Sequence, residues 1–236
     1  MFDPRIVVHI DKQIQAMADE WRRAIDQFQR TMAAIDWDGF LARVGKASEQ
    51  LADLGWTLPM GLSPPEVIDL AGVPIDKVDA FLVAHYTAQH FKALRRVRSE
   101  LLPRPSLSAW RGLLKECFEV FENGKHLVTV PALISTIEGV VACAGNSLHK
   151  QNVSRKFLAA ICADKAKASP RGIKALMWRS LEIFVEKVFQ DAPFDKSRPA
   201  IINRHWILHG RDSPDWTVAD SLRLFCALET IHSLLE

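Results

Sequence analysis

The chain has 236 residues, of which 48% are hydrophobic and 25% are charged, and its formal net charge is +2. This composition is typical of a globular chain with a sizeable core, and it excludes a disordered or fibrous protein for the bulk of the sequence. A single tyrosine, together with Leu, Ala, Ile and Glu at helical spacing, argues against an all-β fold. We therefore expect an all-α protein.

The N-terminal residues, MFDPRIVVHIDKQIQ, include acidic side chains and no uninterrupted apolar core, so they do not resemble a secretory signal. The most apolar stretch, Leu127 to Leu148, is interrupted by Glu138 and Asn146 and predicts no membrane span. We expect a cytoplasmic protein with no membrane partner. Four cysteines lie far apart in apolar segments, which favours buried free thiols over disulfides or a metal site: Cys117, Cys143, Cys162 and Cys226.

The first predicted element is one long helix that ends near Gly39. Apolar residues recur on it at alternating spacings of four and three, as in a coiled coil: Ile10, Ile14, Met17, Trp21, Ala24 and Phe28. Such a stripe needs a partner helix, which belongs either to the same chain or to a second protomer.

A region rich in proline and glycine, residues 54–76, interrupts the helical pattern. Within it, Ser63, Pro64 and Glu66 have the form of a capping box that opens a short helix. A longer helix is expected at residues 76–101, and prolines at 103 and 105 break the chain again. We place a domain boundary there, between a helical N-terminal region, residues 1–104, and a helical bundle, residues 105–236.

Six further helices are predicted from apolar spacing and from the prolines and glycines that separate them: residues 108–122, 131–148, 153–168, 170–190, 200–209 and 217–235. The last of these repeats an apolar residue every third or fourth position, which predicts one buried stripe against the bundle. The predicted fold is therefore a helical bundle with an N-terminal helical extension.

Positive charge is concentrated between Lys150 and Arg179, where eight residues are basic and one is acidic. Local basic surfaces of this kind attract phosphate backbones. Five of the basic residues are candidate RNA contacts: Lys150, Arg155, Lys156, Arg171 and Lys174. The alternative is a solvated helix surface. Tryptophans can stack on bases, but burial in the core is their more frequent role.

Residues 199–210, PAIINRHWILHG, concentrate Asn203, Arg204, His205 and His209. A histidine titrates near neutral pH and an arginine fork binds phosphate oxygens, which are the groups that metal-free RNA cleavage by 2′-hydroxyl attack needs. On one helix, Arg204 and His209 diverge by roughly 140° at about 100° per residue. A second copy across a two-fold axis would bring an arginine of one chain near a histidine of the other.

Two other interpretations of this segment stay open. His205 and His209 lie four residues apart and could form a zinc pair, although a third ligand is missing. The segment could also be a capped helix whose polar groups are satisfied locally. The sequence contains no phosphate-binding loop, dinucleotide fingerprint, serine-hydrolase elbow or HExxH motif, so we expect no cofactor and no metal.

The pattern Asn-Arg-His-x-x-Leu-His-Gly follows a helix break and precedes a final amphipathic helix. It resembles the signature of the HEPN superfamily of prokaryotic helical proteins. Residues 130–142, VPALISTIEGVVA, also resemble a helix that accompanies this signature. The resemblance covers about Trp110 to Glu236 and does not extend to residues 1–100.

The resemblance implies a helical bundle that forms a homodimer with two motifs at one cleft. In many members of the superfamily it also implies a metal-independent endoribonuclease of a toxin–antitoxin, abortive-infection or other anti-phage defence system. Arg204 and His209 would then be the catalytic pair, His205 the supporting polar residue and Asn203 an orienting residue. RNA would be the substrate, and an antitoxin or another defence protein a partner.

Two alternatives to the ribonuclease remain. The superfamily also has inactive members, so the chain could be a non-catalytic module that binds RNA, a nucleotide or a protein. A structural helical adaptor that uses the coiled-coil stripe is the other alternative, and in it Arg204 and His209 would affect only local stability.

Glu138 is a candidate that the signature does not name. It is the only charged residue in segment 130–145, and an ionised carboxylate in such surroundings needs a cationic partner. Arg204 or His209 would serve, and an arginine paired with Glu138 would be held in one orientation. The alternative is that Glu138 faces water at a helix bend near Gly139.

Overall fold

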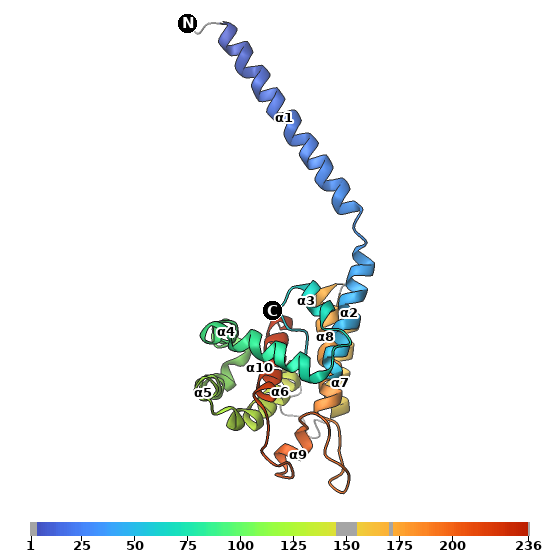
Figure 1. Ribbon diagram of the computed structural model, residues 1–236, viewed down its shortest axis with the longest axis vertical. Helices are drawn as coiled ribbons and strands as arrows, with labels where there is room; N and C mark the ends of the chain where they lie inside the picture. Colours follow the sequence, from blue (N-terminus) through green and yellow to red (C-terminus); the bar gives the residue numbers. More distant parts are fainter. Residues whose placement is uncertain (1–3, 145–154, 170–171, 236) are drawn as a thin grey trace. The chain divides into compact units, whose positions relative to one another are not determined.

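The computed structural model describes residues 4–144, 155–169 and 172–235, and over these residues the protein is helical (Figure 1). No strand occurs in that part of the chain, which confirms the predicted all-α class. Ten α-helices and two short 3-10 helices, η1 and η2, follow in this order: α1 (Pro4–Ala33), α2 (Trp37–Asp53), α3 (Pro64–Asp69), α4 (Ile75–Leu101), η1 (Pro105–Trp110), α5 (Arg111–Glu122), η2 (His126–Val128), α6 (Thr129–Ala144), α7 (Arg155–Ala168), α8 (Ile173–Val188), α9 (Arg204–Leu208) and α10 (Val218–Leu234).

The chain divides into two compact units, Met1–Phe40 and Leu41–Glu236. This division does not coincide with the predicted one after residue 104. The hydrophobic core includes Leu51, Trp56 and Leu82 together with side chains of the later helices, so residues 41–104 belong to the same compact unit as the Arg–His segment.

The long first helix ends earlier than predicted. α1 stops at Ala33, and α2 begins at Trp37, so Gly39 lies inside the second helix. The carboxylate of Asp36 accepts a hydrogen bond from the backbone N–H of Gly39 at 2.8 Å, as an N-cap residue does. A Cβ at residue 39 would lie 1.9 Å from this carboxylate, so the glycine makes room for the cap that starts α2.

α10 lies at the centre of the second unit (Figure 1). It packs against α4, α6 and α8, while α5 packs on α6 and α7 packs on α8. Every residue from Ala219 to His232 is buried. The predicted apolar stripe is buried against the bundle, as Leu222, Phe225, Leu228 and Ile231 show. The sequence did not predict that the polar positions of α10 are buried as well, because α4, α6 and α8 all pack around it.

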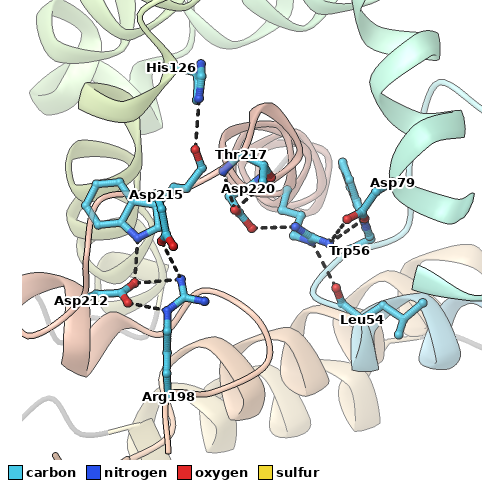
Figure 2. Close-up of polar contacts among 11 residues, drawn as sticks. Leu54, Trp56, Asp79, His126, Arg198, Asp212, Asp215, Thr217 and Asp220 are labelled. Atoms are coloured by element: carbon cyan, nitrogen blue, oxygen red, sulfur yellow. Dashed lines mark hydrogen bonds and ion pairs between the residues drawn. The ribbon is translucent and has the colours of Figure 1, made fainter. Parts of the chain in front are cut away.

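Arg223 shows how α10 buries a charge. Its guanidinium donates to both carboxylate oxygens of Asp79 on α4, at 2.6 and 2.7 Å, and to Asp220 at 2.6 Å (Figure 2). It also donates to the carbonyl oxygen of Leu54 at 3.2 Å and lies 5.2 Å from the ring centroid of Trp56. These contacts satisfy a side chain that is only 3% exposed, and they tie α10 to α4 and to the loop after α2.

The capping box predicted for α3 is confirmed. Ser63 is the N-cap, Pro64 is the first helical residue, and the Glu66 carboxylate accepts from the backbone N–H of Ser63 at 2.7 Å. A hydrogen bond from the Ser63 side chain, followed by this backbone bond, lowers the pKa of Glu66.

α4 contains a turn of the opposite hand. Gln89, His90 and Phe91 have φ values of 51°, 55° and 62°, after Ala88 in an extended conformation. No glycine is present, although left-handed backbone costs an L-residue about 1–2 kcal/mol. The turn separates two right-handed segments, and the sequence carries no signal for it.

The cysteines were predicted to be buried free thiols. Cys117, Cys162 and Cys226 are buried free thiols, as predicted, whereas Cys143 is free but exposed.

Among the described residues, one helical window, His126–Cys143, has the length and mean hydropathy to cross a membrane, and half of it is buried inside the protein. A core helix passes the same test, and α6, within this window, packs against α10.

The tryptophans divide between core and surface. Trp56 and Trp178 are buried, as expected for core residues, whereas Trp21 and Trp37 are exposed. Trp110 and Trp206 are half-buried.

Candidate functional site

The Arg–His segment forms the short helix α9 between two loops. Asn203 is the N-cap: its Oδ1 accepts from the backbone N–H of Trp206 at 3.1 Å, and its Nδ2 donates to the carbonyl oxygen of Gln190 at 3.0 Å. The indole of Trp206 donates to the carbonyl oxygen of Ala192 at 2.9 Å. Asn203 is 2% exposed, so its side chain orients α9 from within the protein.

Arg204, the first residue of α9, is paired with Glu138 on α6. Its Nε and Nη2 donate to the two carboxylate oxygens at 2.9 and 3.0 Å, a bidentate geometry that fixes the guanidinium plane. The two side chains are 32% and 22% exposed. No acceptor within the described ranges bonds to Nη1, so that edge of the guanidinium is available to an anion. The predicted pairing of Glu138 with a cation of this segment is confirmed.

α6 continues as one helix through Gly139, next to Glu138. A Cβ at residue 139 would lie 2.6 Å from the indole ring of Trp110 in η1. The glycine therefore permits a close approach of η1 to α6. Glu138 does not merely face water, as the alternative had it, because it is paired with Arg204.

The two histidines of α9 belong to an aromatic cluster. The ring of His205 stacks on Phe194, with centroids 4.6 Å apart and an interplanar angle of 9°. His209 meets both rings at an angle, 4.7 Å from His205 and 6.0 Å from Phe194. The guanidinium of Arg211 lies 5.4 Å from the Phe194 centroid. We call these four residues the imidazole cluster; Phe194, His209 and Arg211 are exposed.

Arg204 and His209 thus have different partners within one monomer. Arg204 contacts α6, whereas His209 contacts His205 and Phe194. This arrangement agrees with the divergence expected from their spacing. Among the described residues, no group of three or more His, Cys, Asp or Glu side chains is placed to hold a metal ion. His205 and His209 therefore have no third ligand in that part of the chain.

An ion-pair cluster joins the loop before α9 to the loop after it (Figure 2). Arg198 pairs with Asp212, whose side chain is 2% exposed, and lies 3.7 Å from Asp215. The indole of Trp216 donates to Asp212 at 2.7 Å, and the Trp216 carbonyl oxygen bonds to His126 Nε2 at 3.1 Å. The hydrogen bonds with Asp212 raise the pKa of Arg198. The cluster fixes both ends of α9.

The predicted RNA-contacting residues are described only in part. Lys156 on α7 and Lys174 on α8 are exposed, and these two helices pack together. Arg155 begins α7, but its side chain lies outside what the structure describes, and Lys150 and Arg171 lie outside the described residues altogether. Their role in RNA binding stays a prediction.

Sequence reasoning missed Phe194 and Arg211. Neither belongs to a motif. Phe194 meets His205 only because the loop after α8 returns toward α9, and Arg211, in the loop after α9, lies over the ring of Phe194. The turn-forming residues of that loop, DAPFDKSRP at 191–199, were the one sequence signal that a return occurs.

Comparison of the chain with known protein families, with curated proteins and with solved structures gives no match. The all-helical fold is compatible with a HEPN-like bundle. The residues of α9 and α6 are therefore the basis on which a function can be argued.

Proposed function

We propose that this protein is a metal-independent endoribonuclease of the HEPN type. The observation that supports it best is the bidentate Arg204–Glu138 pair at one end of α9, with exposed His209 following the other end. A guanidinium held in one plane with Nη1 unengaged suits a phosphate oxygen, and an exposed imidazole can transfer a proton.

The proposed chemistry needs no metal or cofactor. A base removes the proton of an RNA 2′-hydroxyl, the 2′-oxygen forms a bond to the adjacent phosphorus, and the bond from phosphorus to the 5′-oxygen breaks. An acid protonates the leaving 5′-oxygen, so the products are a 2′,3′-cyclic phosphate and a 5′-hydroxyl. His209 would act as base or acid, and Arg204 would stabilise the charge that develops on the phosphorane oxygens.

Within one monomer the partners of Arg204 and His209 differ, so the proposal includes a homodimer in which Arg204 of one chain acts with His209 of the other. His205 would support His209 through their ring contact, and the exposed Lys156 and Lys174 would contribute to binding the RNA backbone. The proposed setting is a cytoplasmic defence or toxin–antitoxin system with a restraining partner protein.

A non-catalytic RNA-, nucleotide- or protein-binding module is the second candidate. Two contacts favour it. Glu138 neutralises the charge of Arg204, and the ring of His205 is stacked on Phe194. In a binding module the same cluster would hold a phosphate or a base without transferring a proton.

The test is cleavage of end-labelled RNA by the purified protein in EDTA, with analysis of the new 3′ ends. We expect cyclic phosphate ends from the wild type. Arg204→Ala is expected to lower the rate by about 10²–10³-fold, since it removes a charge-stabilising donor, and His209→Ala by about 10²–10⁴-fold.

Matched controls separate the site from general effects. Arg95→Ala and His90→Ala remove the same side-chain types from exposed positions on α4 and should leave cleavage unchanged. RNA binding without cleavage by the wild type, weakened by Arg204→Ala, would replace the enzyme with the binding module. Equal activity in wild type and in both site variants would contradict both candidates.

A further inference from the structure

α1 carries a row of large apolar side chains that the proposed site does not use. Met17, Trp21, Ile25 and Phe28 are 59%, 68%, 49% and 65% exposed. Met17, Trp21 and Phe28 belong to the heptad stripe that begins at Ile10, and Ile25 lies directly beside that stripe. An isolated helix gains little stability from propensity alone, so a stripe of this kind is normally covered by a partner.

The surface of α1 has a hollow of the shape that a facing helix fills. Met17, Glu20, Trp21 and Ala24 line a hollow of about 270 Å³. Their spacing, i, i+3, i+4 and i+7, is that of four residues that surround one inserted side chain in knobs-into-holes packing. Ala24, at the C-terminal end of this set, has the smallest of the four side chains.

The same helix supplies side chains of the kind that such a hollow receives. Trp21 and Phe28 stand one heptad apart on the stripe, each large enough to occupy a hollow bounded by Ala24. A face that contains both the hollow and the side chains to fill it is self-complementary, which is the requirement for an interface around a two-fold axis.

The charge pattern also favours a second copy over a strongly charged partner. Within residues 17–28 the positions that flank the stripe are Ala18, Glu20, Ile25 and Gln27, of which only Glu20 is charged. The other charged side chains of residues 17–31 lie on the outer side of the helix: Asp19, Arg22, Arg23, Asp26 and Arg30. Two copies therefore bring few like charges together, and nothing at the flanks selects a partner of opposite charge.

The length of α1 is sufficient for a specific interface. Its 30 residues span roughly 45 Å at about 1.5 Å per residue. A third of the surface of a cylinder about 10 Å wide is on the order of 500 Å² over that length, or about 1,000 Å² for a pair, which reaches the lower bound for a specific interface.

We propose that α1 pairs with α1 of a second copy of this chain in a two-helix coiled coil that makes the protein a homodimer. The proposed function also includes a homodimer, but this inference rests on residues of the first unit only and not on Arg204 or His209. It assigns to residues 4–33 the role of an association helix.

The test is the mass of the full chain in solution by light scattering at micromolar concentration. The wild type should be a dimer. Trp21→Glu and Phe28→Glu each place a charge in the stripe and should give monomers, whereas Gln29→Glu adds the same charge beside the stripe, at an exposed outer position, and should leave the dimer intact.

Thermal unfolding of the second unit, whose core includes none of the α1 side chains that the structure describes, checks that the variants still fold. A monomeric wild type overturns the proposal, since the stripe is then covered by something other than a second copy. A dimer that survives both charge substitutions overturns it too, because the copies then meet elsewhere. The mass is measured without RNA, so failure of the ribonuclease proposal leaves this result standing.

Discussion

Glu229 is a carboxylate in the middle of the core helix α10, with 1% of its surface exposed. It accepts a hydrogen bond from the hydroxyl of Tyr86 at 3.1 Å and forms an ion pair with Arg96, both on α4. Burial raises the pKa of Glu229, and the neighbouring Arg96 opposes this effect. The charge is therefore tolerated because one cation faces it.

Replacing that cation should expose the cost of the buried charge. Arg96→Met is expected to lower the free energy of unfolding by about 3 kcal/mol at pH 7, the range for removal of one partner of a buried pair. The loss should shrink as the pH falls toward 5, because the pKa of Glu229 rises further without Arg96 and the protonated carboxyl needs no cation. Urea unfolding at both pH values measures the difference.

The double variant Arg96→Met with Glu229→Gln supplies the control. A neutral amide keeps the shape of the carboxyl group, so this variant should recover most of the stability at pH 7. An equal loss at pH 7 and pH 5, with no recovery in the double variant, would contradict the assignment.

The left-handed turn of α4 gives a second prediction for a single side chain. His90 is exposed and has a φ of 55°, where glycine carries no steric penalty. His90→Gly should therefore be neutral or stabilise the protein by up to about 1 kcal/mol, after the entropy gain of the unfolded chain is subtracted. Ala84→Gly, at an exposed right-handed position of the same helix, should cost about 1 kcal/mol. Thermal unfolding of both variants decides whether the turn is present in solution.

Among the helices, α6 carries the side chain that orients Arg204, and its neighbour η1 sets how closely it is packed. Gly139→Ala would place a Cβ 2.6 Å from the indole ring of Trp110. We expect a loss of about 1–3 kcal/mol from overpacking, despite the better helix propensity of alanine. Gly112→Ala is the matched control, because a Cβ at residue 112 meets no atom within 4 Å. If both variants unfold at the same urea concentration, the close approach of η1 and α6 is wrong.

The positions of helices could be predicted where capping residues, prolines or glycines mark their ends. A contact could be predicted only where the chemistry of a side chain requires one kind of partner. Ser63, Pro64 and Glu66 identified the start of α3, and Glu138, alone in an apolar segment, required a cation such as Arg204. The end of α1 was missed because Asp36 caps α2 in the middle of a continuous helical pattern. The Phe194–His205 stack arises from a loop that returns to α9, which no local pattern encodes.

For the second unit taken together, buried thiols predict how stability depends on alkaline pH. Burial raises the pKa of Cys162 and of Cys226 from 9.0 to about 12. Unfolded chains release these protons above pH 9 while the folded protein keeps them, so stability is lost as the pH rises from 9 toward 12. Burial likewise raises the pKa of Cys117 from 9.0 to about 11. At pH 10 each of the three thiols accounts for about 1.4 kcal/mol, or roughly 4 kcal/mol together.

Urea unfolding at pH 8 and pH 10 measures this loss, and Cys162→Ala should reduce it by about a third, since one of the three thiols is then absent. Burial also raises the pKa of Tyr86, which adds to the loss above pH 10. Equal stability at the two pH values would mean that the thiols are accessible to solvent.

The position of α10 in the chain has a consequence for synthesis. The helices that pack around it, α4, α6 and α8, all precede it, so their apolar faces have no central partner until residue 234 has left the ribosome. At about 5–20 residues per second, translation from the start of α4 to the end of α10 takes on the order of 8–32 s. Nascent chains of this protein are therefore expected to engage chaperones throughout that interval, and to complete their fold only after it.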